Sequence, residues 1–282
     1  MTLSPTSAPD PFLRLGPPVA STPLVIAVPH AGRYYPAAIE AERVVARSAL
    51  EDLEDRYADR LIAPAVAAGA VAIVATHARA WIDLNRGEED ACHPDAPDAS
   101  PRARAGLGLV PSRIAGRTLW RELPGADDIR ARLCSLHAPY HGAIAAALAA
   151  ARAAHGVALL VDCHSMPPLG RAGRPGPRIV IGDRHGASAG GGVAEAAMAA
   201  CLRHGLPALR NAPYAGAFTI QHHGHPAAHV HAIQVEIDRS LYLERGLREP
   251  SDRIAEIAQF FADLCWEAVD CLSANCQARA AE

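Results

Sequence analysis

The chain has 282 residues, of which 50% are hydrophobic and 20% are charged, so it can bury the core of one large domain. Its formal net charge of -3 argues against a protein that binds nucleic acid or a membrane surface, because both need a basic face. The basic residues are all arginine, which excludes a Walker-type phosphate loop and a Schiff-base lysine.

Residues 1–20 are rich in proline and predict a loose, flexible arm. They lack the basic start and the apolar stretch of a secretory signal peptide. The seven cysteines are scattered without a C-x-x-C pair, which is typical of reduced thiols. Arg152 and His155 interrupt the longest apolar run, so we expect no membrane span. These features together predict a cytoplasmic protein.

Beyond the arm, short apolar runs alternate with longer alanine-rich segments. The expected strands cover residues 23–30, 70–75, 157–162, 178–183 and 229–238. The expected helices cover residues 51–68, 139–154, 188–204 and 251–272. This alternation predicts one α/β domain over residues 1–282, with a mostly parallel mixed sheet and helices on both faces.

Residues 87–127 interrupt the alternation with a stretch rich in proline, glycine and charge. An insertion of this length exceeds an ordinary loop, and such long loops usually have a function. No Gly/Ser linker divides the chain here. We therefore expect these residues, called the insertion below, to serve an active site within the same domain.

Ionisable side chains stand where three of the expected strands end. His30 follows the first strand, His164 follows residues 157–162, and Glu236 shares one face of the last strand with Gln234. Open parallel sheets bind ligands at the carboxyl ends of their strands. Two imidazoles and a carboxylate with one open coordination position form a catalytic zinc site, so the pattern predicts one zinc ion per chain. Asp162 would then orient His164. The alternative for either histidine alone is a hydrogen-bonded structural role.

The sequence leaves the acidic ligand open. Asp55 and Asp59 lie near the start of the expected helix 51–68, four residues apart and on one helix face. Either carboxylate can reach a metal held by His30. The alternative is that acids at this position only complement the helix dipole.

The stretch "WIDLNR", residues 81–86, offers a carboxylate-binding group. The Arg86 guanidinium can grip a carboxylate with two parallel hydrogen bonds, and Asn85 can add a third. The alternative is an Arg86 that pairs with Asp83 or Glu88 on the surface.

Residues 212–231 contain five histidines beside a group of small residues. Gly216 permits the backbone to approach a small ligand closely. His222 and His223 are candidates to line the same pocket, whereas the default for a histidine-rich tract is adventitious metal binding.

Six short motifs carry a resemblance to a known family. "VPHAGRYYP", "WIDLNR", "HAPYH", "DCHSMPP", "IGDRHG" and "HAIQVEIDRSLY" together resemble the N-formylglutamate amidohydrolase family, in order from about residue 24 to 245. Each motif is short, but six in sequence order make the resemblance specific. The family is similar in fold to the zinc carboxypeptidases and the aspartoacylase group, which implies a zinc-exopeptidase-like fold.

The resemblance also implies an activity and roles for individual residues. It implies a zinc-dependent hydrolase that cleaves N-formyl-L-glutamate to formate and glutamate, late in histidine breakdown. The metal ligands would be His30 and His164, with Asp55 matching the family's acidic helix better than Asp59. Glu236 would be the general base, and Asn85 and Arg86 would hold a substrate carboxylate.

The chain departs from the pattern at two places. Arg33 stands where the carboxypeptidase relatives carry a glutamate ligand, so the acidic ligand must come from elsewhere. Gly216, Ala217 and Phe218 stand where family members often show Gly-Gly-Tyr, and the lost hydroxyl leaves the acyl group open.

We therefore predict a hydrolase for a small substrate that carries a carboxylate. Glu236 would pass a proton from water to the leaving nitrogen, and Arg239 would contact a carboxylate or the oxyanion. If Glu236 merely pairs with Arg239, both roles are structural. The alternatives are a related zinc amidohydrolase or carboxypeptidase acting on another N-acyl amino acid or small peptide, and a non-catalytic carboxylate-binding protein. The sequence predicts no oligomeric state.

Overall fold

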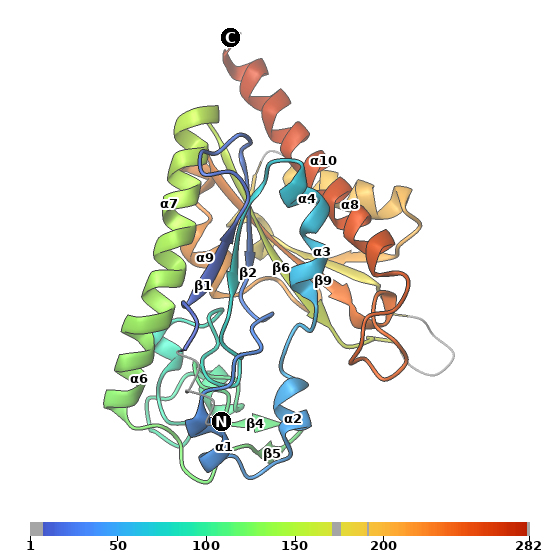
Figure 1. The fold of residues 1–282 in the computed structure, drawn as a ribbon. Helices are drawn as coiled ribbons and strands as arrows, with labels where there is room; N and C mark the ends of the chain where they lie inside the picture. The colour runs from blue at the N-terminus through green and yellow to red at the C-terminus, as the bar shows by residue number, and fades with distance from the viewer. Residues whose placement is uncertain (1–7, 171–175, 191, 281–282) are drawn as a thin grey trace, which may run out of the picture.

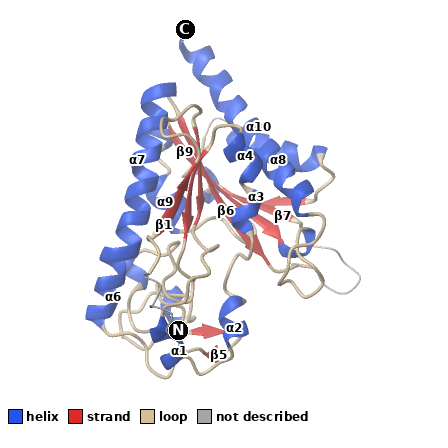
Figure 2. Ribbon diagram, viewed as in Figure 1, coloured by secondary structure: helices blue, strands red, loops and turns tan. Residues whose placement is uncertain are grey.

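The computed structural model describes residues 8–170, 176–190 and 192–280, which form a single α/β domain around a seven-stranded sheet (Figures 1 and 2). The strands stand in the order β1-β3-β2-β6-β9-β7-β8. Their bounds are Phe12–Leu15 (β1), Leu24–Val28 (β2), Val71–Ala75 (β3), Ala158–Met166 (β6), Ile179–Gly182 (β7), Ala208–Arg210 (β8) and Val230–Asp238 (β9). Parallel pairing joins β3, β2, β6 and β9 and joins β7 to β8, whereas β1 and β7 run antiparallel to β3 and β9. The mostly parallel mixed sheet predicted from the sequence is confirmed.

Ten α-helices occur among the described residues. Their bounds are Ala37–Glu42 (α1), Arg47–Glu51 (α2), Ala58–Leu61 (α3), Ala63–Ala67 (α4), Pro101–Arg104 (α5), Ala126–Arg132 (α6), Ala138–His155 (α7), Val193–Arg203 (α8), Phe218–His223 (α9) and Ile254–Ala280 (α10). A π-helical turn, Leu133–His137 (η2), joins α6 to α7. Single 3₁₀ turns occupy Glu88–Asp90 (η1), Arg184–Gly186 (η3), Pro226–Ala228 (η4) and Arg239–Leu241 (η5). No helix within the described residues is long and apolar enough to cross a membrane.

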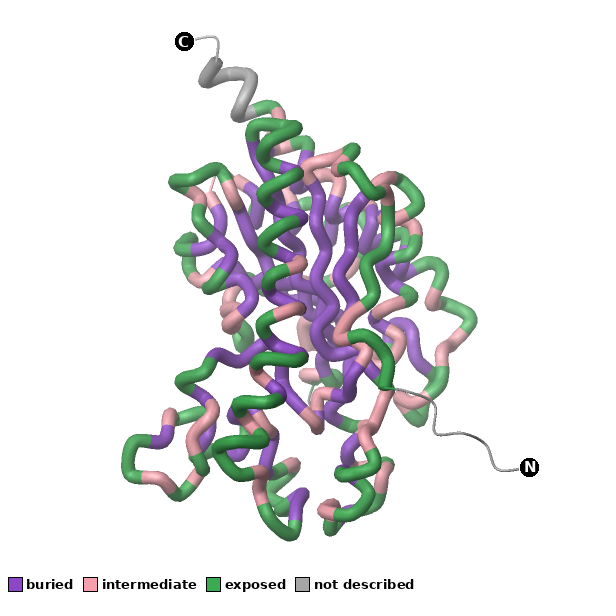
Figure 3. Tube along the Cα trace, turned by 60° about the vertical axis from the view of Figure 1, so that its left-hand side comes forward, coloured by how far each residue is buried: buried purple, intermediate pink, exposed green. Residues whose placement is uncertain are grey.

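The helices cover both faces of the sheet, as predicted. Helices α3, α4, α8 and α10 pack on one face, and α7 and α9 pack on the other (Figure 1). Strand residues divide between the two cores by alternation: Leu24 and Ile26 face the first set of helices, while Val25 and Ala27 face the second. All five residues of β2 are buried, which is typical of a parallel strand covered on both sides (Figure 3).

The expectation of a loose arm over residues 1–20 is wrong for residues 12–15. They form β1, which pairs with β3 in the register Phe12↔Ala75 to Leu15↔Ala72. An exposed sheet edge offers unpaired backbone groups, and this segment satisfies them on β3. Residues 1–7 lie outside the described residues.

The single helix expected over residues 51–68 is also wrong. The segment contains the end of α2, a turn, and the short helices α3 and α4. Tyr57 has a left-handed backbone with φ 61°, and the Asp55 amide donates to the carbonyl of His30 instead of to a helical carbonyl. A non-glycine residue in this conformation interrupts a helix, so Asp55 and Asp59 share no helix face.

Strand β6 is longer than predicted, because it continues through His164 to Met166. Its parallel pairing with β9 extends to Met166↔Asp238, so the backbone groups beyond Asp162 remain paired. Strand β8 was missed in the sequence analysis. It has three residues, too few for an alternation pattern to mark it.

The insertion lies with α1 and α2 below the sheet (Figure 1). It contains α5 and a two-stranded ribbon, Arg113–Ile114 (β4) with Arg117–Thr118 (β5). A small core of its own joins Leu119 and Trp120 of the insertion to Ile39 of α1 and Leu50 of α2. This core fixes the insertion against the part of the chain that follows β2.

We predict that Gly32→Ala destabilises the fold, because a Cβ atom there would lie 2.1 Å from the carbonyl oxygen of His77. Relieving such a backbone contact should cost about 1–3 kcal/mol in the free energy of unfolding. Chemical denaturation checks this. Gly142→Ala on α7 is the matched control, since no atom lies within 4 Å of its Cβ position, and alanine there should be neutral or stabilising. Equal stability of wild type and Gly32→Ala would contradict the prediction.

Candidate active site

A cavity of about 620 Å³ opens at the carboxyl ends of β2, β6 and β9. This is the sheet edge where an open α/β fold binds ligands. The structure brings eight of the residues predicted from the sequence to its wall: His30, Asp55, Asn85, Arg86, His164, Gly216, Glu236 and Arg239. They come from segments that are far apart in the chain, so the fold assembles the cavity.

Both histidine rings turn the same nitrogen toward one carboxylate. Oδ2 of Asp55 lies 3.3 Å from Nδ1 of His30 and 3.0 Å from Nδ1 of His164. The three side chains are buried, and their ligand atoms all lie within 4.8 Å of one another. This group is the one set of metal-ligating side chains found among the described residues. Two imidazoles and one carboxylate leave a tetrahedral metal an open position, as in a catalytic site.

The far nitrogen of each ring is held by a further carboxylate. Nε2 of His30 lies 2.7 Å from Oδ1 of Asp83, and Nε2 of His164 lies 2.9 Å from Oδ2 of Asp162. A carboxylate at Nε2 favours the tautomer that leaves the Nδ1 lone pair bare for a metal. Asp162 therefore contacts His164 as predicted. Asp83 makes the equivalent contact with His30, a role that the sequence analysis did not assign.

The donor set also fits a cation electrostatically. Burial alone would raise the pKa of Asp55, but hydrogen bonds and charge from His164 and His30 hold it well below its usual range. Oδ1 of the buried Asp162 has no hydrogen-bond partner among the described residues. A cation held on the Nδ1 side of His164 would offset this buried negative charge. The residues present therefore fit a divalent metal ion.

Asp59 lies apart from this group. Its two carboxylate oxygens accept hydrogen bonds from Arg33, at 3.1 and 2.7 Å, and both side chains are partly exposed. The carboxylate that meets the histidines is thus Asp55, placed by the turn before α3 and by the hydrogen bond from its amide to the carbonyl of His30.

Arg239 lies behind the same carboxylate. It donates from Nη2 to Oδ1 of Asp55 at 3.1 Å and from Nε to the Ser165 hydroxyl at 3.0 Å. A third nitrogen donates to the carbonyl of Asp52. These contacts commit the guanidinium to holding Asp55 in position, and no ion pair joins Arg239 to Glu236 within the described part of the chain.

Glu236 lies directly opposite His164 in the parallel register of β6 and β9. Oε1 of Gln234 accepts a hydrogen bond from the Ala217 amide. Nε2 of Gln234 then donates to Oε1 of Glu236 at 2.9 Å, which fixes the orientation of the carboxylate. Burial raises the pKa of Glu236 to about 7, with the charge of His164 opposing the shift. A carboxylate with this pKa can accept and return a proton near neutral pH.

Asn85 and Arg86 both reach the cavity wall. The Asn85 side chain accepts from the Thr219 amide at 2.8 Å, which places its NH₂ group 3.1 Å from Nε2 of His164, the ring nitrogen that Asp162 also contacts. Arg86 is mostly buried and donates from Nε and Nη1 to the carbonyls of Leu107 and Asn85. Its nearest approach to Asp83 is 3.9 Å, too long for a hydrogen bond, so part of the Arg86 fork remains available for a ligand.

The residues of the histidine-rich tract divide between two environments. Gly216 lines the cavity with a backbone φ of +106°, which a side chain would strain. His222 and His223 lie on α9 in a cluster of rings and are not among the described residues that line the cavity. His223 contacts His141, and His222 stacks on Phe218.

Two histidines that the sequence analysis did not single out hold the loop that carries Asn85. His141 donates from Nε2 to the carbonyl of Leu84, and His137 donates from Nε2 to the carbonyl of Arg86, each at 2.8 Å. Burial lowers the pKa of His141 to about 2, so the ring stays neutral. Both residues belong to "HAPYH", whose four-residue spacing places them on one helix face and was the signal available in the sequence.

Arg79 is a further residue that sequence reasoning missed. It lines the cavity and donates to Oδ2 of Asp83 from Nε and Nη2, at 2.9 and 2.8 Å. The Arg79 charge, followed by those of Arg86 and His30, lowers the pKa of the buried Asp83 well below its usual range. The four-residue spacing of Arg79 and Asp83 in the sequence gave no sign of this pair, because the segment is not helical.

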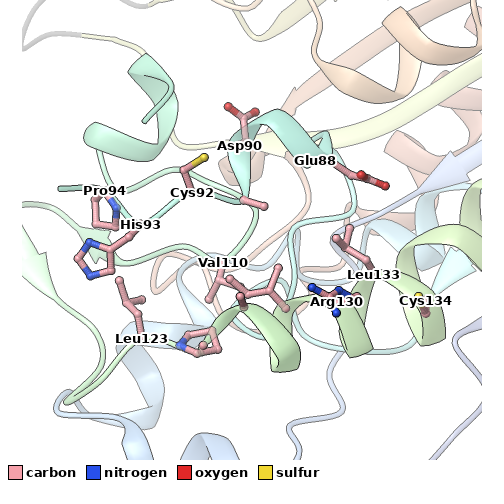
Figure 4. Close-up of a pocket in the computed structure, with 15 residues that line it drawn as sticks. Glu88, Asp90, Cys92, His93, Pro94, Val110, Leu123, Arg130, Leu133 and Cys134 are labelled. Atoms are coloured by element: carbon pink, nitrogen blue, oxygen red, sulfur yellow. The ribbon is translucent and has the colours of Figure 1, made fainter. Parts of the chain in front are cut away.

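A second cavity of about 680 Å³ lies between α6 and the insertion (Figure 4). Its lining combines apolar side chains such as Val110, Leu123 and Leu133 with the ionisable residues Glu88, Asp90, His93 and Arg130. None of the predicted site residues lines it. The larger cavity is therefore not the candidate active site.

Fold and site together define a class of protein: a single α/β domain with a buried two-histidine, one-carboxylate group at the carboxyl edge of its sheet. Residues 22–243 match the model of the N-formylglutamate amidohydrolase family. The chain belongs to this family, and the resemblance seen in its six motifs is confirmed.

Several relatives support this membership. The chain is 33% identical to an N-formylglutamate deformylase of Pseudomonas aeruginosa, over 79% of this chain and 82% of the relative. It is 31% identical to an N-formylglutamate deformylase of Pseudomonas putida, over 84% and 87%. Among solved structures, an N-formylglutamate amidohydrolase from Ralstonia eutropha JMP134 superposes with a TM-score of 0.82 at 29% identity, covering 93% of this chain and 97% of that one.

We predict that His141 supports activity through its hydrogen bond to the carbonyl of Leu84. His141→Ala should lower the free energy of unfolding by about 1–3 kcal/mol, because a buried carbonyl loses its donor, and it should also reduce kcat. His141→Gln should restore most of both, since its amide can reach the same carbonyl. Denaturation and steady-state kinetics on both variants check this. Full activity in a folded His141→Ala protein would show that the loop does not need this contact.

Proposed function

We propose that this protein is a zinc-dependent amidohydrolase that cleaves N-formyl-L-glutamate to formate and glutamate. The observation that carries the proposal is the pairing of Glu236 with His164 across β6 and β9, which sets a carboxylate of raised pKa beside a buried metal-binding group. Relatives named N-formylglutamate deformylase support the substrate. We further propose that the reaction takes place in the cytoplasm and serves histidine breakdown.

His30, Asp55 and His164 would hold the zinc ion. When bound there, zinc would supply Lewis acidity, which polarises the scissile carbonyl and lowers the pKa of water. Asp83 and Asp162 would keep the two rings in the tautomer that binds metal, and Arg239 would hold Asp55 in place.

The remaining steps belong to residues of the chain. Glu236 would accept the proton of the attacking water and deliver it to the amide nitrogen as the carbon–nitrogen bond breaks. Gln234 keeps Glu236 oriented toward the cavity. Arg86, together with Asn85, would bind a carboxylate of the substrate at the cavity wall that both residues line.

A carboxylate-binding protein without catalysis would not need this arrangement. The arginines that line the cavity would be enough to bind a carboxylate, but binding alone does not require the buried Glu236 and the Asp55 group that line the same cavity. A buried carboxylate of raised pKa costs stability, and groups kept at such a cost are found preferentially at sites of reaction. The geometry therefore favours a catalyst over a binding protein.

We predict that the purified protein binds about one zinc ion per chain and releases formate from N-formyl-L-glutamate. His164→Ala should lose metal and activity together. Removing a residue that only hydrogen-bonds to a metal ligand lowers metal affinity or activity by roughly 10- to 100-fold, and removing the ligand itself should lower them further. Elemental analysis and a formate assay on the same samples check this.

Asp59→Asn is the matched control for that experiment, because Asp59 pairs with Arg33 away from the histidines. It should keep the metal and the activity. If His164→Ala bound one zinc ion per chain with unchanged affinity, His164 would not be a metal ligand. If the zinc-loaded wild type released no formate, N-formyl-L-glutamate would not be the substrate.

We predict that Glu236→Gln lowers kcat by about 10²- to 10⁴-fold, because it keeps the shape of the side chain but removes the proton acceptor. Zinc content should stay near that of wild type. Since Glu236 must be ionised to act, wild-type activity should fall as the pH drops through its pKa, which burial raises and a bound cation would lower. The pH–rate profile of the variant should lack this acidic limb. A folded variant with nearly normal turnover would remove Glu236 from the mechanism.

A further inference from the structure

We propose that Arg102 of the insertion is a specificity-determining residue that binds the side-chain carboxylate of an acidic N-acyl amino acid. The proposal rests on the proposed function and assigns the second carboxylate of its substrate. It follows from how the arginines around the cavity use their hydrogen-bond donors.

Four arginines line the cavity: Arg79, Arg86, Arg102 and Arg239. Two of them are committed to the protein. Arg79 donates two hydrogen bonds to Asp83, and Arg239 donates to Asp55, Ser165 and the carbonyl of Asp52. Arg79 is thus paired through two nitrogens with the buried Asp83, and Arg239 uses all three of its nitrogens beside the buried Asp55, so the charge of each is already balanced by an acid of the protein.

The other two arginines retain free donors. Arg86 uses Nε and Nη1 on backbone carbonyls. Arg102 donates no hydrogen bond to any described residue, and its nearest acid is Asp90, whose Oδ2 lies 3.5 Å from Nη1. That separation supports an ion pair but not a good hydrogen bond. The side chain of Arg102 is 44% exposed, so a ligand that enters the cavity can reach its fork.

The insertion holds Arg102 in place without consuming its donors. Ser100 caps α5 by accepting from the Ala103 amide at 3.0 Å, and its hydroxyl also bonds to Oδ1 of the buried Asp90. Oδ2 of Asp90 has no hydrogen-bond partner among the described residues and faces the Arg102 cation. Asp90 thus sets the position of the charge, while the N–H groups remain open.

Arg86 and Arg102 present two positive charges to one cavity. Burial lowers the pKa of Arg86, and the charges of Arg79 and Arg102 lower it further while Asp83 opposes them. Like charges near each other are costly unless an anion joins them. A substrate with two carboxylates meets this need, one at Arg86 and one at Arg102, because each arginine fork binds a single carboxylate. The cavity therefore selects N-acyl derivatives of acidic amino acids over neutral ones.

The test compares two substrates that differ only in the side-chain charge, N-formyl-L-glutamate and N-formyl-L-glutamine. Arg102→Gln should lower kcat/KM for the glutamate substrate by roughly 10- to 200-fold, the value of a charged hydrogen bond, chiefly through KM. Its effect on the glutamine substrate should be less than about 3-fold, within the range of a neutral surface change. Arg102→Lys should restore part of the loss, because lysine keeps the charge but lacks the fork.

Arg104→Gln is the matched control. Arg104 lies on the same short helix, bonds to the carbonyl of Pro97 and does not line the cavity. It should leave both substrates unaffected. Equal losses on both substrates in Arg102→Gln, or no loss on either, would overturn the proposal.

An independent measurement separates this proposal from the proposed function. A zinc-loaded wild type that hydrolyses neither substrate would refute the function, and calorimetric binding of L-glutamate against L-glutamine would then decide the role of Arg102. Preference for glutamate in wild type, lost in Arg102→Gln, supports it. Equal wild-type affinity for the two amino acids overturns it.

Discussion

The site depends on the contacts of the Asp55 carboxylate with the two histidine rings. One of its oxygens faces Nδ1 of both His30 and His164, and the other accepts from Ser165 and Arg239. Its amide donates to the carbonyl of His30, so backbone and side chain together tie the turn before α3 to the end of β2. A buried carboxylate is stable only when its oxygens are satisfied, and here the partners that satisfy it are the parts of the site.

The hydrogen-bond network around Asp55 continues beyond the two histidine rings, through the contacts of their Nε2 atoms. Asp83 contacts the His30 ring and also accepts a hydrogen bond from Arg79. The same loop contains Asn85, whose side chain lies beside His164. This loop has no regular structure of its own, so its position depends on His137 and His141, which bond its carbonyls from the start of α7. Helix α7 therefore does more than cover the sheet, because it helps to fix the loop whose Asp83 orients the His30 ring and whose Asn85 lies beside His164. We infer that mutations at this helix end affect the reaction without touching the substrate.

The sequence predicted those parts of the molecule that a local pattern records. Alternating and continuous apolar runs marked β2, β3, β6, β7 and β9, and ionisable residues at strand ends marked His30, His164 and Glu236. The same reasoning failed for residues 51–68, because the hydrogen bond from Asp55 to His30 overrides the helical pattern. Strand β1, the Arg79–Asp83 pair and the cluster around His141 depend on contacts across the fold. The spacing of residues within one segment cannot show contacts between distant segments. The length of the insertion indicated that it has a function but not which chemistry it supplies.

The distribution of charge around the cavity explains why the fold needs both a sheet edge and an insertion. Asp162, His164 and Glu236 stand near the carboxyl ends of β6 and β9, where paired backbone holds them rigidly and the register fixes Glu236 against His164. The arginines with free donors lie elsewhere: Arg86 on the loop after β3 and Arg102 on α5. Arg79, on the same loop as Arg86, and Arg239, on η5, use their donors on Asp83 and Asp55. Arg86 and Arg102 form no hydrogen bond with these two acids. Separation from the metal-binding group leaves their forks open to a ligand. The sheet can therefore keep its reaction geometry while the insertion, which packs on its own small core, sets which substrate is accepted.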